Sequence, residues 1–393
     1  MHTRVVTTLL LLAFMVLLAS GCTTTEVKTT EVTPLKYETN TIPEEELLDV
    51  GINIFDPGLD QINQEDSEVP VFSEIRIAES SYFPYLLMET IQSTGAWGAV
   101  RVIPEGHSSV DVIVDGTIIK SDGETLEISI AVRDSKNRAW FSKTYQNKAS
   151  HYAYSSRSQV SNEPFQNIYN QIANDILAYK SALNSASIRE LRKVSELKFA
   201  SAFAEQQFSS YLKQNDAGEL TINRLPADNE PMMQRIKQIR ERDYLFIDTL
   251  QEYYGSYAKE MQPPYKLWRK ESYNEVVSLR NMQRTATNQK LLGAAAIIAG
   301  ILGAGNSNGS VRAASMIGVT AGGYLIKDGM ERSEEALIHA EALQELGDSF
   351  EASIESQVIE LEDRTVTLTG TVENQYMQWR DILKDIYQIN NGE

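Results

Sequence analysis

The sequence has few of the groups on which thiol and metal chemistry depend. Its 393 residues include one cysteine, Cys22, and four histidines. A single cysteine cannot form a disulfide within the chain, so the fold must be stabilised by packing. Neither His107 nor His151 shows metal-ligand spacing with carboxylates. No metal site and no cofactor are therefore expected, and these histidines are expected in the core or on the surface.

Positive charge is also scarce. The chain has 36 Lys and Arg residues against 54 Asp and Glu residues, a formal net charge of −18. A protein this acidic repels phosphate-rich surfaces, so nucleic acid is not an expected partner. The length allows two or three domains with cores of their own.

The N-terminus has the three regions of an export signal. Arg4 precedes an apolar run from Leu9 to Leu18, and Ala19-Ser20-Gly21 follows directly before Cys22. We expect residues 1–21 to be removed. An ordinary secretory signal is the alternative to a lipoprotein signal.

The small residues before Cys22 resemble a bacterial lipobox. The resemblance implies cleavage before Cys22, acylation of that residue with a diacylglycerol and palmitate-type chains, and no free thiol for catalysis. Thr23 stands where an aspartate would favour retention in the inner membrane. By this resemblance the protein is expected in the outer membrane, lipid-anchored and mainly periplasmic.

Residues 22–46 are rich in threonine and glutamate and repeat Thr-Thr-Glu-Val at 24–27 and 29–32. Such a segment has too few apolar groups to form a core. It is expected to be a flexible, lipidated tether.

Residues 47–183 have a mixed α/β pattern. Alternating apolar residues and turn signals predict the order β-α-β-β-β-β-α. Pro84 suits the first turn of the first helix, and Gly95 suits its C-terminal cap. The expected elements are strands at 50–55, 100–103, 110–119, 126–132 and 139–145, and helices at 84–93 and about 165–176.

Three stretches of this region resemble a known family. They are Val110-Asp111-Val112-Ile113-Val114-Asp115-Gly116-Thr117-Ile118, the hairpin from Ile130 to Trp140, and Ser93-Thr94-Gly95-Ala96-Trp97. They resemble the periplasmic α/β domain shared by the TolB amino-terminal region and the curli-secretion (CsgG-like) lipoproteins. The resemblance implies a non-enzymatic envelope module, such as a ring-forming secretion lipoprotein or an activator of peptidoglycan synthesis.

The rest of the chain is mainly helical. Residues 184–262 carry apolar residues at helical spacing, and Pro263-Pro264 predicts a helix break. Residues 263–357 then predict a long antiparallel helical hairpin with an apolar tip at 291–326. Residues 358–393 predict a β-hairpin and a helix. The expected fold class is α+β.

The tip carries two stripes of small residues. This spacing allows helix backbones to approach closely in membranes or in oligomers. Each apolar arm, 14 to 16 residues long, is shorter than the roughly 20 residues that span a bilayer. Membrane insertion and a buried soluble hairpin both remain open. The candidate packing residues are Gly293, Ala296, Gly300, Ala304, Ala314, Gly318 and Gly322.

The turn at the tip also fits the G-x-S-x-G pattern of serine hydrolases. A nucleophile elbow requires a strand before the serine, whereas Ser307 follows a helical pattern. The partners would be Asp328 and His339, 11 residues apart and so about 16 Å apart along one helix. A serine hydrolase with Ser307 as nucleophile is the third alternative for the function of the chain.

These patterns predict a non-enzymatic outer-membrane lipoprotein that oligomerises as a structural part of an envelope assembly. A secretion or surface-appendage complex is an example. The alternative function is a regulatory lipoprotein that binds and activates a periplasmic enzyme such as a peptidoglycan synthase. The expected partners are the membrane, further copies of the chain and an unknown periplasmic protein.

Overall fold

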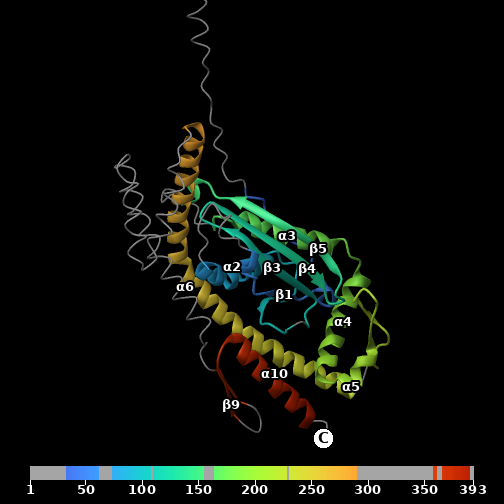
Figure 1. Ribbon diagram of the computed structural model, residues 1–393. Coiled ribbons are helices and arrows are strands. Elements are labelled where there is room, and N and C mark those ends of the chain that lie inside the picture. The colour runs from blue at the N-terminus through green and yellow to red at the C-terminus, as the bar shows by residue number, and fades with distance from the viewer. Residues whose placement is uncertain are drawn as a thin grey trace, which may run out of the picture. The chain divides into compact units, whose positions relative to one another are not determined.

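A computed structural model gives the structure of this chain (Figure 1). The structure describes residues 32–61, 73–107, 109–154, 163–227, 230–289, 357–360 and 365–389. The signal region, Cys22 and the whole apolar tip lie outside these residues.

A five-stranded mixed sheet forms the centre of the N-terminal part. Its strand order is β2-β1-β3-β4-β5. β1 pairs in parallel with both β2 and β3, and β3, β4 and β5 are antiparallel neighbours. The strands are β1 (Val50–Asn53), β2 (Val100–Ile103), β3 (Val112–Ser121), β4 (Thr125–Asp134) and β5 (Ala139–Lys148).

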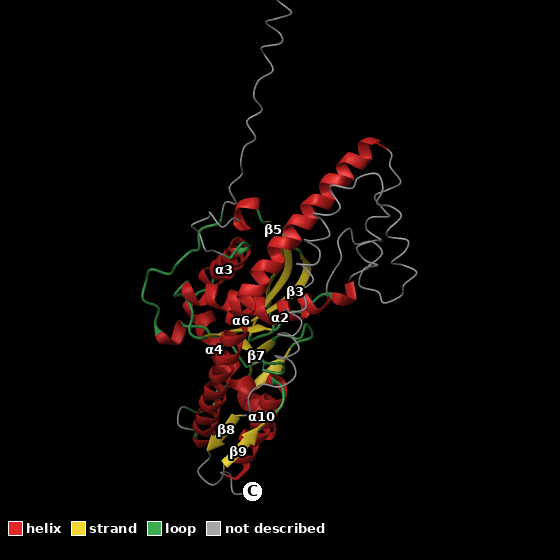
Figure 2. Ribbon diagram, turned by 90° about the vertical axis from the view of Figure 1, so that its left-hand side faces the viewer, coloured by secondary structure: helices red, strands yellow, loops and turns green. Residues whose placement is uncertain are grey.

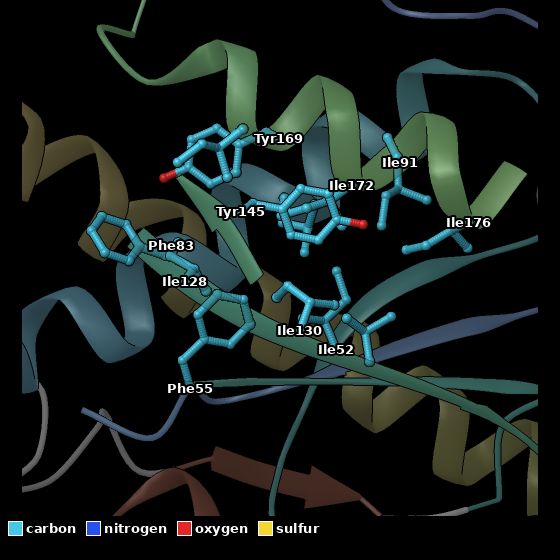
Figure 3. Packing of buried hydrophobic residues seen from close by; sticks show 14 of the residues in the cluster. Ile52, Phe55, Phe83, Ile91, Ile128, Ile130, Tyr145, Tyr169, Ile172 and Ile176 are labelled. Carbon is cyan, nitrogen blue, oxygen red and sulfur yellow. The ribbon is translucent and has the colours of Figure 1, made fainter. Parts of the chain in front are cut away.

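Helices α2 (Ser73–Ser93) and α3 (Gln166–Ser181) pack on one face of this sheet. Figure 3 shows the side chains of α3 meeting those of the strands in a close-packed apolar layer. The alternation in β4 is confirmed, because Leu126, Ile128, Ile130 and Val132 are all buried. The apolar face expected for the closing helix is also buried. The predicted order β-α-β-β-β-β-α is found.

The first helix is longer than predicted. We expected it to begin at Pro84, but α2 begins at Ser73 and contains Pro84 in its interior. Proline has no N–H, so the carbonyl four residues earlier loses its helical partner. That carbonyl belongs to Ser80, and it accepts a 2.9 Å hydrogen bond from the N–H of Phe55 instead. A contact from outside the helix therefore makes the proline tolerable. Gly95 does cap the helix, with φ of +69°.

The region after α3 contains a small β-hairpin that the sequence pattern does not predict. Helix α4 (Ser185–Phe203) is followed by the short α5 (Glu205–Phe208). Strands β6 (Leu212–Gln214) and β7 (Leu220–Ile222) then pair with each other, where the spacing of residues 184–262 predicts helix. The 3-10 helices are η1 (Glu44–Glu46), η2 (Leu59–Gln61), η3 (His151–Tyr154) and η4 (Ser209–Tyr211).

Helix α6 (Pro231–Gln289) runs unbroken for 59 residues. The expected break at Pro263-Pro264, and the domain boundary placed there, are wrong. Both prolines lie inside the helix. Two missing N–H groups bend a helix but need not end it when both sides are packed. Figure 1 shows α6 changing direction between its yellow and orange parts.

The C-terminal part is a β-hairpin and a helix, as predicted. Strands β8 (Gln357–Glu360) and β9 (Thr365–Leu368) pair only with each other among the described strands. Helix α10 (Val372–Ile389) packs on α6 (Figure 2). The predicted fold class, an α/β domain followed by long helix, hairpin and helix, is therefore confirmed. The second arm of the predicted helical hairpin lies outside the described residues.

Candidate functional site

Three asparagines on α3 bind the N-terminal segment of the described chain through its backbone. We call residues 33–38 the strap. The asparagine amides supply both donors and acceptors, so they pair with the strap as a neighbouring strand would. The bonds run from the Thr33 N–H to Asn167 Oδ1 (2.8 Å), from Asn170 Nδ2 to the Thr33 carbonyl (2.8 Å), from Asn174 Nδ2 to the Pro34 carbonyl (2.9 Å) and from the Lys36 N–H to Asn174 Oδ1 (2.8 Å).

The spacing of these residues explains the fit. Thr33 and Lys36 are three residues apart, about 10 Å in an extended chain. Asn167 and Asn174 are seven residues apart, also about 10 Å in a helix. The strap therefore runs along α3 in the same direction. The Glu38 N–H continues the contact by donating to the carbonyl of Thr94 (2.8 Å).

The tether prediction for 22–46 is therefore wrong for its described part. From Thr33 onward the chain is held on the α/β domain, and Leu35 and Ile42 pack against the core. Composition suggested otherwise because the partners lie on another element, 134 to 140 residues away. The only local signal is the row of asparagines on one face of the predicted closing helix.

Helix α6 crosses the domain at this same end, which we call the strap end. Arg269 of α6 forms an ion pair with Glu163, just before α3. The guanidinium also lies over the rings of Phe165 (4.6 Å) and Tyr265 (4.2 Å). Arg269 is almost fully buried. Glu163 and the nearby tyrosines outweigh this burial and hold the pKa of Arg269 well above its ordinary value.

A second carboxylate, Glu79 of α2, completes the charged cluster. Its side chain is fully buried and accepts hydrogen bonds from Tyr265 and from Ser121 Oγ. Burial raises the pKa of Glu79, and the cations Arg76 and Arg269 oppose the shift. The cluster therefore joins a helix, a strand and α6 by charged and aromatic contacts inside the core.

The turn between β3 and β4 presses directly on α6. A Cβ atom at Gly123 would overlap the backbone oxygen of Arg269 and the backbone nitrogen of Tyr273. The Gly123 N–H donates to Ser272 Oγ (3.1 Å), and its carbonyl accepts from Tyr154 Oη (2.6 Å). Only glycine allows this approach, so α6 is fixed in position where it passes the sheet.

A different polar cluster lies at the other end of the sheet, where α10 meets α6. Nδ1 of His107 shares a 2.7 Å hydrogen bond with Tyr376 Oη and lies 3.4 Å from Asp243 Oδ2. His107 Nε2 has no hydrogen-bond partner within the described part of the chain. Burial lowers the pKa of His107, and Asp243 opposes this. We call these three residues the histidine cluster.

The two aspartates of the β3 region do not form a pair. Asp111, just before β3, is buried and accepts hydrogen bonds from Ser195 Oγ and from the Asp49 N–H (2.9 Å). Asp115 has other partners: it accepts from Asn53 Nδ2 (2.6 Å) and pairs with Arg133 (3.4 Å). No carboxylate pair for acid–base chemistry results.

Helix α6 also covers the free edge of the sheet at β2. Gln251 accepts from the Val102 N–H (2.9 Å) and donates to the Val102 carbonyl (2.8 Å), as a further strand would. Arg101 forms a two-pronged contact with Asp248 at 2.5 and 3.0 Å. The edge is therefore closed to pairing with another chain at this point.

None of the predicted packing or lipid-attachment residues lies in the described part of the chain. This holds for Cys22 and for the seven small residues at 293–322, as well as for Ser307, Asp328 and His339. Within the described residues, no group of histidine, cysteine and acidic side chains could hold a metal ion. Nor is any helix there long and apolar enough to cross a membrane.

No protein-family model matches the chain, and neither a curated protein nor a solved structure does so. The resemblance to the TolB amino-terminal and CsgG-like domain therefore stays a prediction. What the structure adds is the strap end, where the start of the described chain and the long helix α6 come together.

Proposed function

We propose that the protein is a non-enzymatic outer-membrane lipoprotein, anchored through Cys22, that serves as an oligomeric structural component of an envelope assembly. One observation carries the proposal. The chain that follows Cys22 is bound at Asn167, and α6, which leads to the apolar segment 291–326, passes the domain at Glu163, only four residues away. A lipid on Cys22 and the small-residue stripes would then reach the same membrane.

The oligomer is tested by mass. The mature protein is extracted in detergent, and its mass is measured before and after Gly300→Leu and Gly318→Leu. We expect an oligomer that these substitutions break, because leucine prevents close approach of helix backbones. Gly255→Leu is no suitable control, since Gly255 contacts Tyr85. Ala286→Leu, on α6 before the stripes, is the control. A monomer in every case contradicts the proposal.

A second function, binding and activation of a periplasmic enzyme, is favoured by the open face of the sheet. Helices α2 and α3 cover the opposite face. On the open face, short side chains lie between the ion pair Asp115–Arg133 and Glu127. The residues are Thr117, Ser129, Ala131, Ser142 and Thr144, of which the last two and Ala131 are exposed.

Binding at this face is tested with Thr144→Arg. The matched control is Thr221→Arg, an exposed threonine on the separate strand β7. Capture of a peptidoglycan synthase by the wild type and the control, with loss in Thr144→Arg, would support the second function. Equal capture by all three would exclude the open face as the binding surface.

A further inference from the structure

The contacts at the strap end also fix the direction in which the strap runs. The strap runs along α3 from Asn167 toward Asn174, so its N-terminal residues lie beside the start of that helix. α6 passes the same place at Arg269 and continues for another 20 residues to Gln289. Figures 1 and 2 both show this end of α6 extending past the sheet.

Two lengths agree at this end. The 20 residues of α6 from Arg269 to Gln289 make a rod of about 30 Å. Ten residues separate Cys22 from Val32, where the described chain begins, and they can span at most about 36 Å. A lipid on Cys22 therefore cannot lie much farther from the domain than the end of α6.

The charge of the helix end fits an anionic surface. Residues 276–289 contain Arg280 and Arg284 and no acidic residue, although acidic residues outnumber basic ones by 54 to 36 in the whole chain. Basic side chains next to a bilayer are attracted to anionic headgroups. Before this point α6 carries Glu271 and Glu275, and 276–289 is the longest acid-free stretch of the helix.

We infer that the strap end faces the phospholipid surface in which Cys22 is anchored, and that α6 from Arg269 to Gln289 is a spacer that meets its anionic headgroups. The inference rests on the proposed lipid anchor. The domain stands about 30 Å from the membrane, with α10 on its far side. Because residues 33–38 are bound to the domain, they do not lengthen the link between the domain and the lipid.

Energy transfer from single-site labels to acceptor-labelled lipid tests this orientation. The full lipidated protein is bound to vesicles of phosphatidylethanolamine and phosphatidylglycerol, and a donor is attached to Gln289→Cys, Tyr152→Cys or Met377→Cys. Tyr152 and Met377 are a matched pair, 58% and 56% exposed. Tyr152 belongs to η3, which contacts α6 near Tyr273, whereas Met377 is next to Tyr376, which stacks on Phe246.

We expect transfer to fall in the order Gln289→Cys, Tyr152→Cys, Met377→Cys. The last two should differ at least about twofold, since roughly 27 residues of α6, from Phe246 to Tyr273 and about 40 Å of helix, separate their levels. Equal transfer from Tyr152→Cys and Met377→Cys, or the reverse order, overturns the inference. If mass spectrometry finds no diacylglycerol on Cys22, both the proposed anchor and the inference fail.

The charge contribution is tested in the same vesicles. Arg280→Gln with Arg284→Gln should lower transfer from Gln289→Cys, and replacing phosphatidylglycerol by phosphatidylcholine should do the same. Lys259→Gln with Lys266→Gln removes equal charge from exposed positions earlier on α6 and should have no effect. Equal effects of the two double substitutions would contradict a headgroup contact at the helix end.

Discussion

Helix α6 meets the α/β domain at two places that are held in different ways. At the strap end, Arg269 is buried among aromatic rings and paired with Glu163. At the other crossing, Gln251 pairs with the backbone of Val102, and the buried His107 meets Asp243. The first crossing is therefore made by buried charged and aromatic side chains. The second can change with pH.

The largest effect should come from breaking the charged crossing. Arg269→Met leaves Glu163 without its cation and removes one of the two cations beside the buried Glu79. Loss of one partner of a buried pair costs about 3–5 kcal/mol. Chemical denaturation should show a loss of stability of this order. Lys270→Met removes a half-exposed cation from the neighbouring Lys270–Glu271 pair and should change stability by less than about 1 kcal/mol. Similar losses in both variants would show that burial does not increase the contribution of Arg269 to stability.

Removal of the contact between Gln251 and Val102 should reduce the free energy of unfolding by less. Gln251→Leu leaves the N–H and carbonyl of Val102 without their side-chain partner. An unsatisfied buried group costs about 1–3 kcal/mol. Denaturation should therefore show an intermediate loss, and the exposed edge of β2 should make the variant more prone to aggregate. Gln234→Leu, an exposed position on the same helix, is the control. Stability unchanged in Gln251→Leu would mean that water replaces the amide at no cost.

The histidine cluster predicts that the stability of the protein depends on pH. Burial lowers the pKa of His107 in the folded protein below the ordinary 6.5. The unfolded chain therefore binds a proton first, and stability is full above about pH 6.5 and falls as the pH decreases below it. The slope cannot exceed about 1.4 kcal/mol per pH unit for one group. Asp243 and Tyr376 face the imidazole, with Tyr244, Arg240 and Arg380 nearby.

Denaturation at pH 7 and pH 5.5 measures this effect. His107→Gln should be less stable than wild type at pH 7 and should lose less stability on acidification. Because carboxylates also titrate, the comparison is between slopes and not absolute values. An unchanged slope in His107→Gln would show that the histidine cluster contributes nothing to acid sensitivity.

The smallest effect is expected for the ion pair between Arg101 and Asp248, next to Gln251. Asp248 is about half exposed, so its pair with Arg101 is screened by water. Asp248→Asn should reduce the free energy of unfolding by no more than about 1 kcal/mol. The reduction should shrink further at high salt, as measured by denaturation at two salt concentrations. A loss as large as that of Arg269→Met would remove the distinction between the two crossings.

Local patterns predicted the sheet well and the long-range contacts poorly. The alternation in β4 and the turn signal between the strands expected at 110–119 and 126–132 depend on neighbouring residues, and both elements are found. Pro84 and Pro263 were read as helix starts or breaks because their local chemistry favours that. For Pro84 the decisive partner is the N–H of Phe55, almost thirty residues earlier, which no periodicity reveals.

The strap illustrates the same limit at the candidate site. Its threonine-rich surroundings predict free chain, yet Asn167, Asn170 and Asn174 bind it from another element. The histidine cluster likewise joins a loop, α6 and α10, whose residues are up to 269 positions apart. The sequence suggested a satisfied histidine at 107, but it could not name Tyr376 as the partner.

The direction of the strap determines how the domain would bear a pulling force. A load applied at Val32 and directed away from the start of α3 acts along the strap, so the bonds to Asn167, Asn170 and Asn174 resist it together. A load at right angles would open them one after another. The sheet lies beneath α3 and is not in the path of this force. A domain held in this way bears a force transmitted through its anchor without separation of its strands.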